Sequence, residues 1–159
     1  RLVKGSHIIT KKLYKEDVAF TFQNTDKRII FVIPYKKQFS LIGTTEVEVK
    51  SPENTVISKQ ETQYLIRSVN NYLKKQISKK DIVDTYSGIR PLIEDFKEAS
   101  KVTRDYVFDL QIVKKLPLLN IYGGKLTTYR KLSEKVLLDL KKFLPKTKKG
   151  PWTDKKKLF

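Results

Sequence analysis

Cysteine is absent from the 159 residues of this chain, and so is methionine. Without cysteine the chain forms no disulfide and uses no thiolate, which fits a reducing compartment such as the cytoplasm. Because methionine is missing even at position 1, we expect a piece of a longer protein. No apolar run approaches the roughly 20 residues of a membrane-spanning helix, and no signal peptide opens the chain.

Acidic residues and arginine are also scarce. There are 17 Asp and Glu against 34 Lys and Arg, which gives a formal net charge of +17. Such a charge is typical of proteins that bind nucleic acid or anionic lipid. Only 6 of the cations are arginines, however, and base and phosphate recognition relies on the arginine fork. We therefore predict a solvated basic surface and no nucleic-acid partner, with a basic nucleic-acid or anionic-lipid binding module as the alternative.

The apolar pattern of the first half predicts an antiparallel meander followed by a helix. Segments rich in Ile, Val, Phe and Thr, separated by short polar breaks, predict four strands: Lys4–Thr10, Ala19–Asn24, Arg28–Pro34 and Phe39–Glu48. Ser58 and Glu61 have the spacing of a capping box and predict a helix to about Lys75. Its apolar face would carry Leu65, Ile66, Val69, Tyr72 and Leu73.

The second half predicts three more strands and a final helix. The strands are Asp81–Tyr86, ended by Ser87–Gly88, then Asp105–Ile112 and the apolar Leu118–Tyr122, with a loop at 94–101 and a turn at Lys114–Pro117. We expect Leu118–Tyr122 to be buried on both faces. The helix runs from about Thr127 to Leu144, before Pro145, with an inward face of Leu132, Val136, Leu137, Leu140, Phe143 and Leu144. The fold class is α+β, because regular β–α alternation and its glycine fingerprint are missing.

Gly123–Lys125 lies between the last predicted strand and the final helix. A strand, a glycine turn and a helix start present backbone N–H groups, here those of Leu126–Thr128, and a positive dipole to an anion. A nucleotide P-loop is excluded, because Leu119 and Leu126 occupy its first glycine and its Ser/Thr position. A tight turn with a solvated Lys125 is the alternative.

Three other residues are candidates for chemistry. Arg90 is kept extended by Pro91 and can bind a carboxylate or phosphate, or make a surface ion pair. Arg104 can be a second anion ligand or pair with Asp105. His7 is the only histidine, either structural or available for acid–base chemistry near neutral pH. With one His and no Cys, we predict no metal site.

Six motifs occur in the order seen in one family: Arg1–Ile8, Phe31–Tyr35, Leu41–Thr45, Tyr86–Leu92, Thr103–Tyr106 and Gly123–Arg130. Over roughly residues 1 to 145 the sequence resembles the FAD-dependent glycerol-3-phosphate dehydrogenases, respiratory flavoenzymes with a D-amino-acid-oxidase-like fold. The resemblance implies oxidation of sn-glycerol 3-phosphate to dihydroxyacetone phosphate, with electrons passed to FAD and then to quinone. It also implies a cytoplasmic enzyme at the inner membrane face. Glycerophosphate oxidases, which use oxygen, share these motifs.

The same resemblance implies roles for individual residues. Arg90 should hold the substrate phosphate, with Arg104 and Lys125 completing a cationic cradle, and His7 should lie near the C2 hydroxyl as a candidate base. His7, Arg90 and Lys125 are thus the predicted catalytic residues. The isoalloxazine ring should contact Gly88, Gly123, Gly124, Lys125, Leu126, Thr127 and Thr128.

The glycine-rich G-x-G-x-x-G unit with which the family begins is missing from the sequence. The resemblance therefore implies a middle-to-C-terminal piece. It would comprise a substrate-binding sheet and helix at 1–80, a segment returning to the FAD domain at 81–145, and a mobile basic tail at 146–159. We expect this piece neither to retain FAD tightly nor to be active. Surfaces that pack on the missing half, including Leu118–Tyr122, should be exposed or self-associate.

Overall fold

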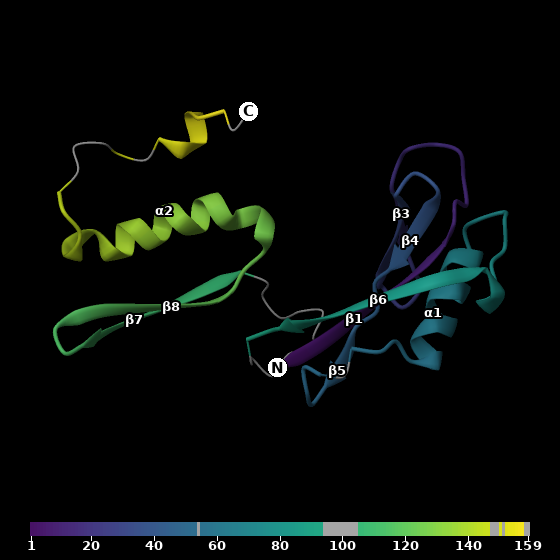
Figure 1. The fold of residues 1–159 in the computed structure, drawn as a ribbon, viewed down its shortest axis with the longest axis horizontal. Helices are drawn as coiled ribbons and strands as arrows, with labels where there is room; N and C mark the ends of the chain where they lie inside the picture. The colour runs from purple at the N-terminus through teal and green to yellow at the C-terminus, as the bar shows by residue number, and fades with distance from the viewer. Residues whose placement is uncertain (54, 94–104, 147–149, 151, 158–159) are drawn as a thin grey trace. The chain divides into compact units, whose positions relative to one another are not determined.

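The computed structural model describes residues 1–53, 55–93, 105–146, 150 and 152–157. They fall into two compact units, residues 1–92 and the described residues from Ile93 onward (Figure 1). The predicted boundary at residue 80 precedes β6 (Ile82–Pro91), which pairs with β1 (Leu2–Lys11) inside the first unit. The loop predicted at 94–101 lies outside the described residues.

The first unit is built on an antiparallel sheet with β1 near its centre. The other strands are β2 (Phe20–Gln23), β3 (Ile29–Tyr35), β4 (Phe39–Gly43), β5 (Val47–Val49) and β6. The order is β2-β3-β4-β1, and β6 pairs with β1 from Leu2 to Thr10. Since β6 takes one edge of β1, β4 and β5 share the other. The predicted meander is therefore correct for β2–β4 but wrong for β1, which joins beside β4.

Two strand predictions needed correction at their ends. Phe39–Glu48 is not one strand, because Thr45 leaves the ladder between β4 and β5 and bonds through its N–H to the Ser6 carbonyl at 3.2 Å. The strand predicted to end at Ser87–Gly88 continues to Pro91. Gly88 does not break it, since it pairs directly with Gly5 of β1.

The helix α1 (Lys59–Asn70) covers one face of the sheet (Figure 1). Its capping box is confirmed: Glu61 N–H donates to Ser58 Oγ at 3.1 Å, and Ser58 N–H donates to Glu61 Oε2 at 2.8 Å. The buried core between helix and sheet consists of Ile8, Ile30, Val32, Ile42, Leu65, Val69 and Ile77. The helix ends before the predicted Lys75, so Leu73 and the half-exposed Tyr72 lie past its end.

The second unit is a hairpin of β7 (Tyr106–Val113) and β8 (Leu116–Gly123) with the helix α2 (Tyr129–Leu140). The turn is only Lys114 and Lys115, both at positive φ, and is shorter than the predicted Lys114–Pro117. Leu118, Ile121 and Tyr122 are 43–50% exposed. The prediction that β8 is buried on both faces is therefore wrong. Its exposed side chains agree instead with the expectation that surfaces which pack on the missing half are exposed.

The helix α2 has a half-buried stripe and no fully buried residue. Of the predicted inward face, Leu132, Val136, Leu140 and Phe143 are half-buried, whereas Leu137 and Leu144 are exposed and were wrongly placed. Within the predicted basic tail, Thr153 donates a hydrogen bond to Glu134 of α2. None of the described helices is long and apolar enough to cross a membrane.

Candidate active site on the outer face of the sheet

The face of the sheet opposite α1, called here the outer face, carries three of the predicted site residues: His7, Gly88 and Arg90. Along β1, Lys4, Ser6 and Ile8 are on the α1 side, so Gly5 and His7 are on the outer face. Residues paired across strands share a face. His7 pairs with Gly43 of β4 and with Tyr86 of β6, and Val3 pairs with Arg90. The register thus brings His7 and Arg90 to the same side of the sheet.

The imidazole of His7 lies across Gly43. A Cβ on Gly43 would be 2.1 Å from His7 Cδ2, and the Tyr86 ring centroid is 6.0 Å from that of His7. Nδ1 of His7 is buried and has no hydrogen-bond partner within the described chain. Burial, and secondly the positive charge of Arg90, lower the pKa of His7 below its ordinary 6.5. His7 is therefore a neutral imidazole at neutral pH and can accept a proton.

The guanidinium of Arg90 lies across Gly5 in the same way. A Cβ on Gly5 would be 2.4 Å from Nη1 and 2.5 Å from Nη2 of Arg90. Nη2 also donates to Thr44 Oγ1 at 3.2 Å. The extended conformation predicted for Arg90 before Pro91 is confirmed, since both belong to β6. These contacts fix the head of a long cationic side chain against the sheet.

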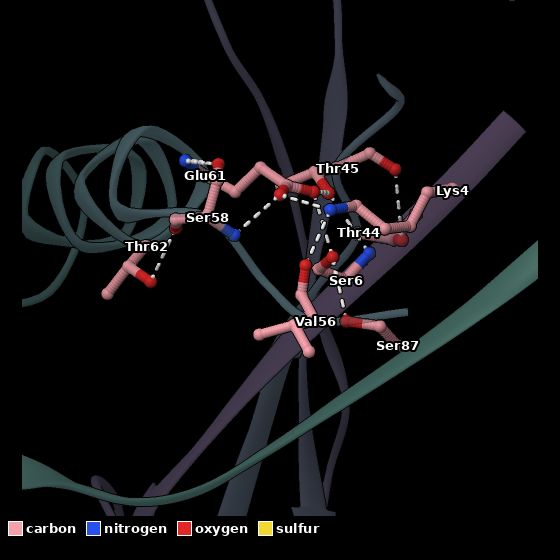
Figure 2. Close-up of polar contacts among 9 residues, drawn as sticks. All are labelled: Lys4, Ser6, Thr44, Thr45, Val56, Ser58, Glu61, Thr62 and Ser87. Atoms are coloured by element: carbon pink, nitrogen blue, oxygen red, sulfur yellow. Dashed lines mark hydrogen bonds and ion pairs between the residues drawn. The ribbon is translucent and has the colours of Figure 1, made fainter. Parts of the chain in front are cut away.

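A buried polar cluster lies on the other side of the same strands (Figure 2). Glu61 of α1 is 4% exposed and forms an ion pair with Lys4, with 3.0 Å between Oε2 and Nζ. Its Oε1 accepts from Ser6 Oγ at 2.8 Å and from Thr45 Oγ1 at 2.7 Å. Ser87 of β6 donates to Ser6 Oγ at 2.9 Å. One carboxylate thus connects α1 with β1 and the segment after β4, and Ser6 extends the cluster to Ser87 of β6.

The hydrogen bonds decide the charge of Glu61. Burial alone would raise the pKa of this carboxyl, but the Ser58 N–H and the side chains of Thr45, Lys4 and Ser6 lower it from 4.5 to about 2. Glu61 is therefore ionised at neutral pH. Sequence reasoning identified Glu61 only as part of a capping box. The available signal for the cluster was Lys4, a cation inside an apolar strand.

The predicted flavin-contacting segment Gly123–Thr128 lies in the second unit. Gly123 and Gly124 join β8 to a 3₁₀ turn at Leu126–Thr128, which precedes α2. Their φ angles are 72° and 93°, a region that glycine adopts without strain. Added Cβ atoms would be 3.0 Å from the Asp105 carbonyl oxygen and 3.3 Å from Tyr106 Cβ, respectively. The backbone therefore requires glycine at both positions.

The start of this helix differs from the prediction in its first turn. Leu126–Thr128 is 3₁₀ rather than α-helical, and Thr128 N–H donates to the Lys125 carbonyl at 3.0 Å. Thr128 therefore uses the N–H that the sequence assigned to an anion. Leu126 is 89% exposed, and Lys125 and Thr127 are exposed as well.

Within the first unit, the structure groups three of the predicted residues. His7, Gly88 and Arg90 share the outer face of the first unit. Gly123–Thr128 belongs to the second unit, where it is exposed from Gly123 to Thr127. Arg104 lies outside the described residues.

Residues 1–130 match the family described as FAD dependent oxidoreductase (DAO). The chain belongs to this family. It is 49% identical over 140 residues to an aerobic glycerol-3-phosphate dehydrogenase of Escherichia coli, with 86% of this chain and 28% of that protein covered. It is 45% identical over 155 residues to a D-erythritol 1-phosphate dehydrogenase of Brucella abortus, with 96% and 31% covered.

A solved structure has a similar fold. It is the glycerol-3-phosphate dehydrogenase of Bacillus halodurans complexed with FAD, with a TM-score of 0.66 and 25% identity over 89% of this chain. This chain covers 27% of that structure and spans less than a third of the curated relatives just named. The comparison agrees with the α+β class and the antiparallel sheets.

The residues present fit one part of FAD. The isoalloxazine ring is planar, and its pyrimidine edge carries oxygen and nitrogen acceptors with one N–H donor between the two carbonyl groups. Exposed glycine backbone at Gly123 and Gly124, followed by the cation Lys125, is suited to such an edge. The sequence has no G-x-G-x-x-G for the dinucleotide part. The fit is therefore to the flavin ring and not to the whole cofactor.

Proposed function

We propose that this chain supplies the substrate side of an FAD-dependent enzyme that oxidises sn-glycerol 3-phosphate to dihydroxyacetone phosphate. The observation that carries the proposal is that a neutral imidazole, His7, and the Arg90 guanidinium lie on the same face of one sheet. The substrate has the complementary groups, a secondary hydroxyl and a phosphate. The name of the relative at 49% identity supports the same substrate.

In this proposal each residue has a separate task. Arg90 binds the phosphate through its forked N–H donors, and Lys125 and Arg104 add positive charge. His7 accepts the proton of the C2 hydroxyl, for which a lowered pKa, and so a neutral imidazole at neutral pH, is suited. Gly88 and Gly123–Thr128 contact the flavin ring. When bound, FAD accepts the hydride from C2.

The finer parts of the proposal concern the acceptor and the isolated chain. Electrons leave FAD for a quinone, and the enzyme is cytoplasmic and lies peripherally at the inner membrane face. The chain alone holds much less than one equivalent of FAD, is inactive, and self-associates through β8, whose exposed side chains support this. Purification of the chain with near-stoichiometric yellow flavin, or as a monomer in light scattering, would contradict the corresponding part.

The experiment uses the complete protein that contains this chain. Arg90→Lys keeps the charge but loses the fork, so KM for sn-glycerol 3-phosphate should rise at least 10-fold. His7→Gln should lower kcat by about 10²-fold or more, the usual contribution of a general base. Surface variant Lys79→Gln is the control. Unchanged kinetics in both variants would overturn the assignment.

Two further assays test the substrate and the acceptor. D-erythritol 1-phosphate is the competing substrate, because one relative at 45% identity is named for it. A higher kcat/KM for that compound would transfer the proposal to the longer polyol phosphate. Oxygen consumption with no quinone reduction would instead indicate an oxidase.

A further inference from the structure

The outer face places two glycines directly beneath the two site side chains. The Cβ position of Gly5 is 2.4 Å from Arg90 Nη1, and that of Gly43 is 2.1 Å from His7 Cδ2. Ordinary van der Waals contact begins near 3.4 Å. Any residue with a Cβ at Gly5 or Gly43 would therefore have to displace the side chain above it by about 1 Å or more.

This requirement is specific to these two positions in the sheet. Gly88 pairs with Gly5 and lies on the same face, yet its Cβ position meets only Tyr86 Oη, at an ordinary 3.8 Å. Neither Gly5 nor Gly43 has a positive φ. A left-handed φ therefore does not account for glycine at either position, whereas the contact with Arg90 or His7 does.

We propose that Gly5 and Gly43 are positioning residues. Because they lack a Cβ, the Arg90 guanidinium and the His7 imidazole can lie directly against the sheet, at the distance from it that substrate binding requires. This rests on the proposed function of Arg90 and His7. Each head group also has a neighbour within the same face: Thr44 Oγ1 accepts from Arg90 Nη2 at 3.2 Å, and the Tyr86 ring lies beside His7. With a Cβ beneath it, each head group would rise into the space for substrate.

The proposal separates the effects of the two glycines. Gly5→Ala displaces the phosphate-binding group, so it should mainly raise KM, by about 10-fold or more. Gly43→Ala displaces the base, so it should mainly lower kcat, by about 10²-fold, as expected when a reacting group moves by 1 Å. Gly150→Ala is the matched control, because nothing lies within 4 Å of its Cβ position.

A double-variant cycle in the complete, FAD-loaded protein tests whether Gly5 acts through Arg90. Once Arg90→Ala has removed the guanidinium, Gly5→Ala should cost nothing further in kcat/KM. The same holds for Gly43→Ala in a His7→Ala background. If the two losses simply add, or if Gly5→Ala behaves like Gly150→Ala, the positioning role is refuted. If Arg90→Ala itself leaves KM unchanged, the proposed function fails instead.

Folding of the variants provides an independent readout. If Gly43→Ala does not fold, His7→Ala/Gly43→Ala should fold, because the ring that blocks the new Cβ is gone. If the double variant also fails to fold, Gly43 is required for another reason and the inference is wrong. Circular dichroism and bound-flavin absorbance distinguish these outcomes before any kinetics are measured.

Discussion

The buried carboxylate of Glu61 permits the sharpest test of how the first unit is held together. In Glu61→Gln the amide oxygen can still accept from Ser6 and Thr45, but the negative charge is lost. Lys4, itself 4% exposed, then loses its carboxylate partner and retains the Val56 carbonyl, which accepts from Nζ at 2.6 Å. The variant thus measures the contribution of the negative charge, while the size of the side chain and its hydrogen bonds to Ser6 and Thr45 are kept.

Two independent estimates give the loss of folding free energy in Glu61→Gln. The pKa of Glu61 is about 2 against an ordinary 4.5, a gap of about 2.5, which at about 1.4 kcal/mol per pH unit is about 3 kcal/mol of stabilisation of the ionised form. Removing one partner of a buried ion pair typically costs about 3–5 kcal/mol. Both estimates therefore predict a loss of about 3 kcal/mol or somewhat more.

The pH dependence has a definite sign. A carboxyl whose pKa is lowered by folding stabilises the protein above its unfolded pKa, here 4.5, and loses this contribution as the pH falls toward 2. The wild-type protein should therefore lose about 3 kcal/mol between pH 5 and pH 2 through this group, and Glu61→Gln should not show that part of the slope.

Hydrogen–deuterium exchange of the β1 and α1 amides in the complete protein measures the local free energy directly. At pH 7 a loss of about 3 kcal/mol corresponds to roughly 10²-fold faster exchange. The matched control is Glu48→Gln, because Glu48 pairs with Arg1 at 2.8 Å but is 59% exposed, and such pairs contribute about 0–1 kcal/mol. Lys4→Met/Glu61→Gln should recover part of the loss, since no buried charge remains. Equal effects of the Glu61 and Glu48 variants would refute the reasoning.

Three further substitutions have definite expectations, each measured by thermal melting of the complete protein. Gly124→Ala should destabilise by about 1–2 kcal/mol, because φ of 93° is left-handed and Tyr106 Cβ is close, whereas Gly150→Ala should be neutral; equal melting temperatures would contradict this. Replacing Lys114-Lys115 by Asn-Gly should stabilise the hairpin by about 1 kcal/mol, because both lysines have positive φ in a two-residue turn; a lower melting temperature would count against that turn. Asn70→Ala should cost about 1–3 kcal/mol, since its side chain bonds both the N–H and the carbonyl of Ile77 at 2.9 Å; no change would show that the loop after α1 is held otherwise.

Local patterns in the sequence predicted the elements but not all of their ends. The capping box at Ser58 and Glu61 is a contact between residues three apart, so the sequence alone specifies it. The helix α1 ends at Asn70, whose side chain accepts from the N–H of Ile77, seven residues later. Gly88 looks like a strand end in isolation, and only its pairing with Gly5 makes it part of β6.

In the candidate site, too, local features were predictable from the sequence and contacts between distant residues were not. His7 and Arg90 were predicted from residue type and motif, and their lying on one face follows from strand register, which the sequence did not provide. Gly5 and Gly43 belonged to the quoted motifs but had no assigned role, because the need for glycine depends on side chains far away in sequence. The ion pair of Lys4 and Glu61 joins residues 57 positions apart and had no local signature.

The two faces of β1 explain why such different chemistry is found in one strand. On the α1 side the Glu61 carboxylate binds Ser6 and Thr45. Ser6 directly precedes His7 in β1, and Thr45 directly follows Thr44. On the outer face His7 lies across Gly43, and Thr44 accepts from Arg90. Because a strand transmits displacement from one residue to the next, loosening the cluster should also loosen the site. Glu61→Ala, which removes the acceptor of both hydroxyls, should therefore lower kcat/KM at pH 7, while Glu48→Ala should not. A Glu61→Ala protein that loses stability but keeps full kcat/KM would show that the two faces are independent.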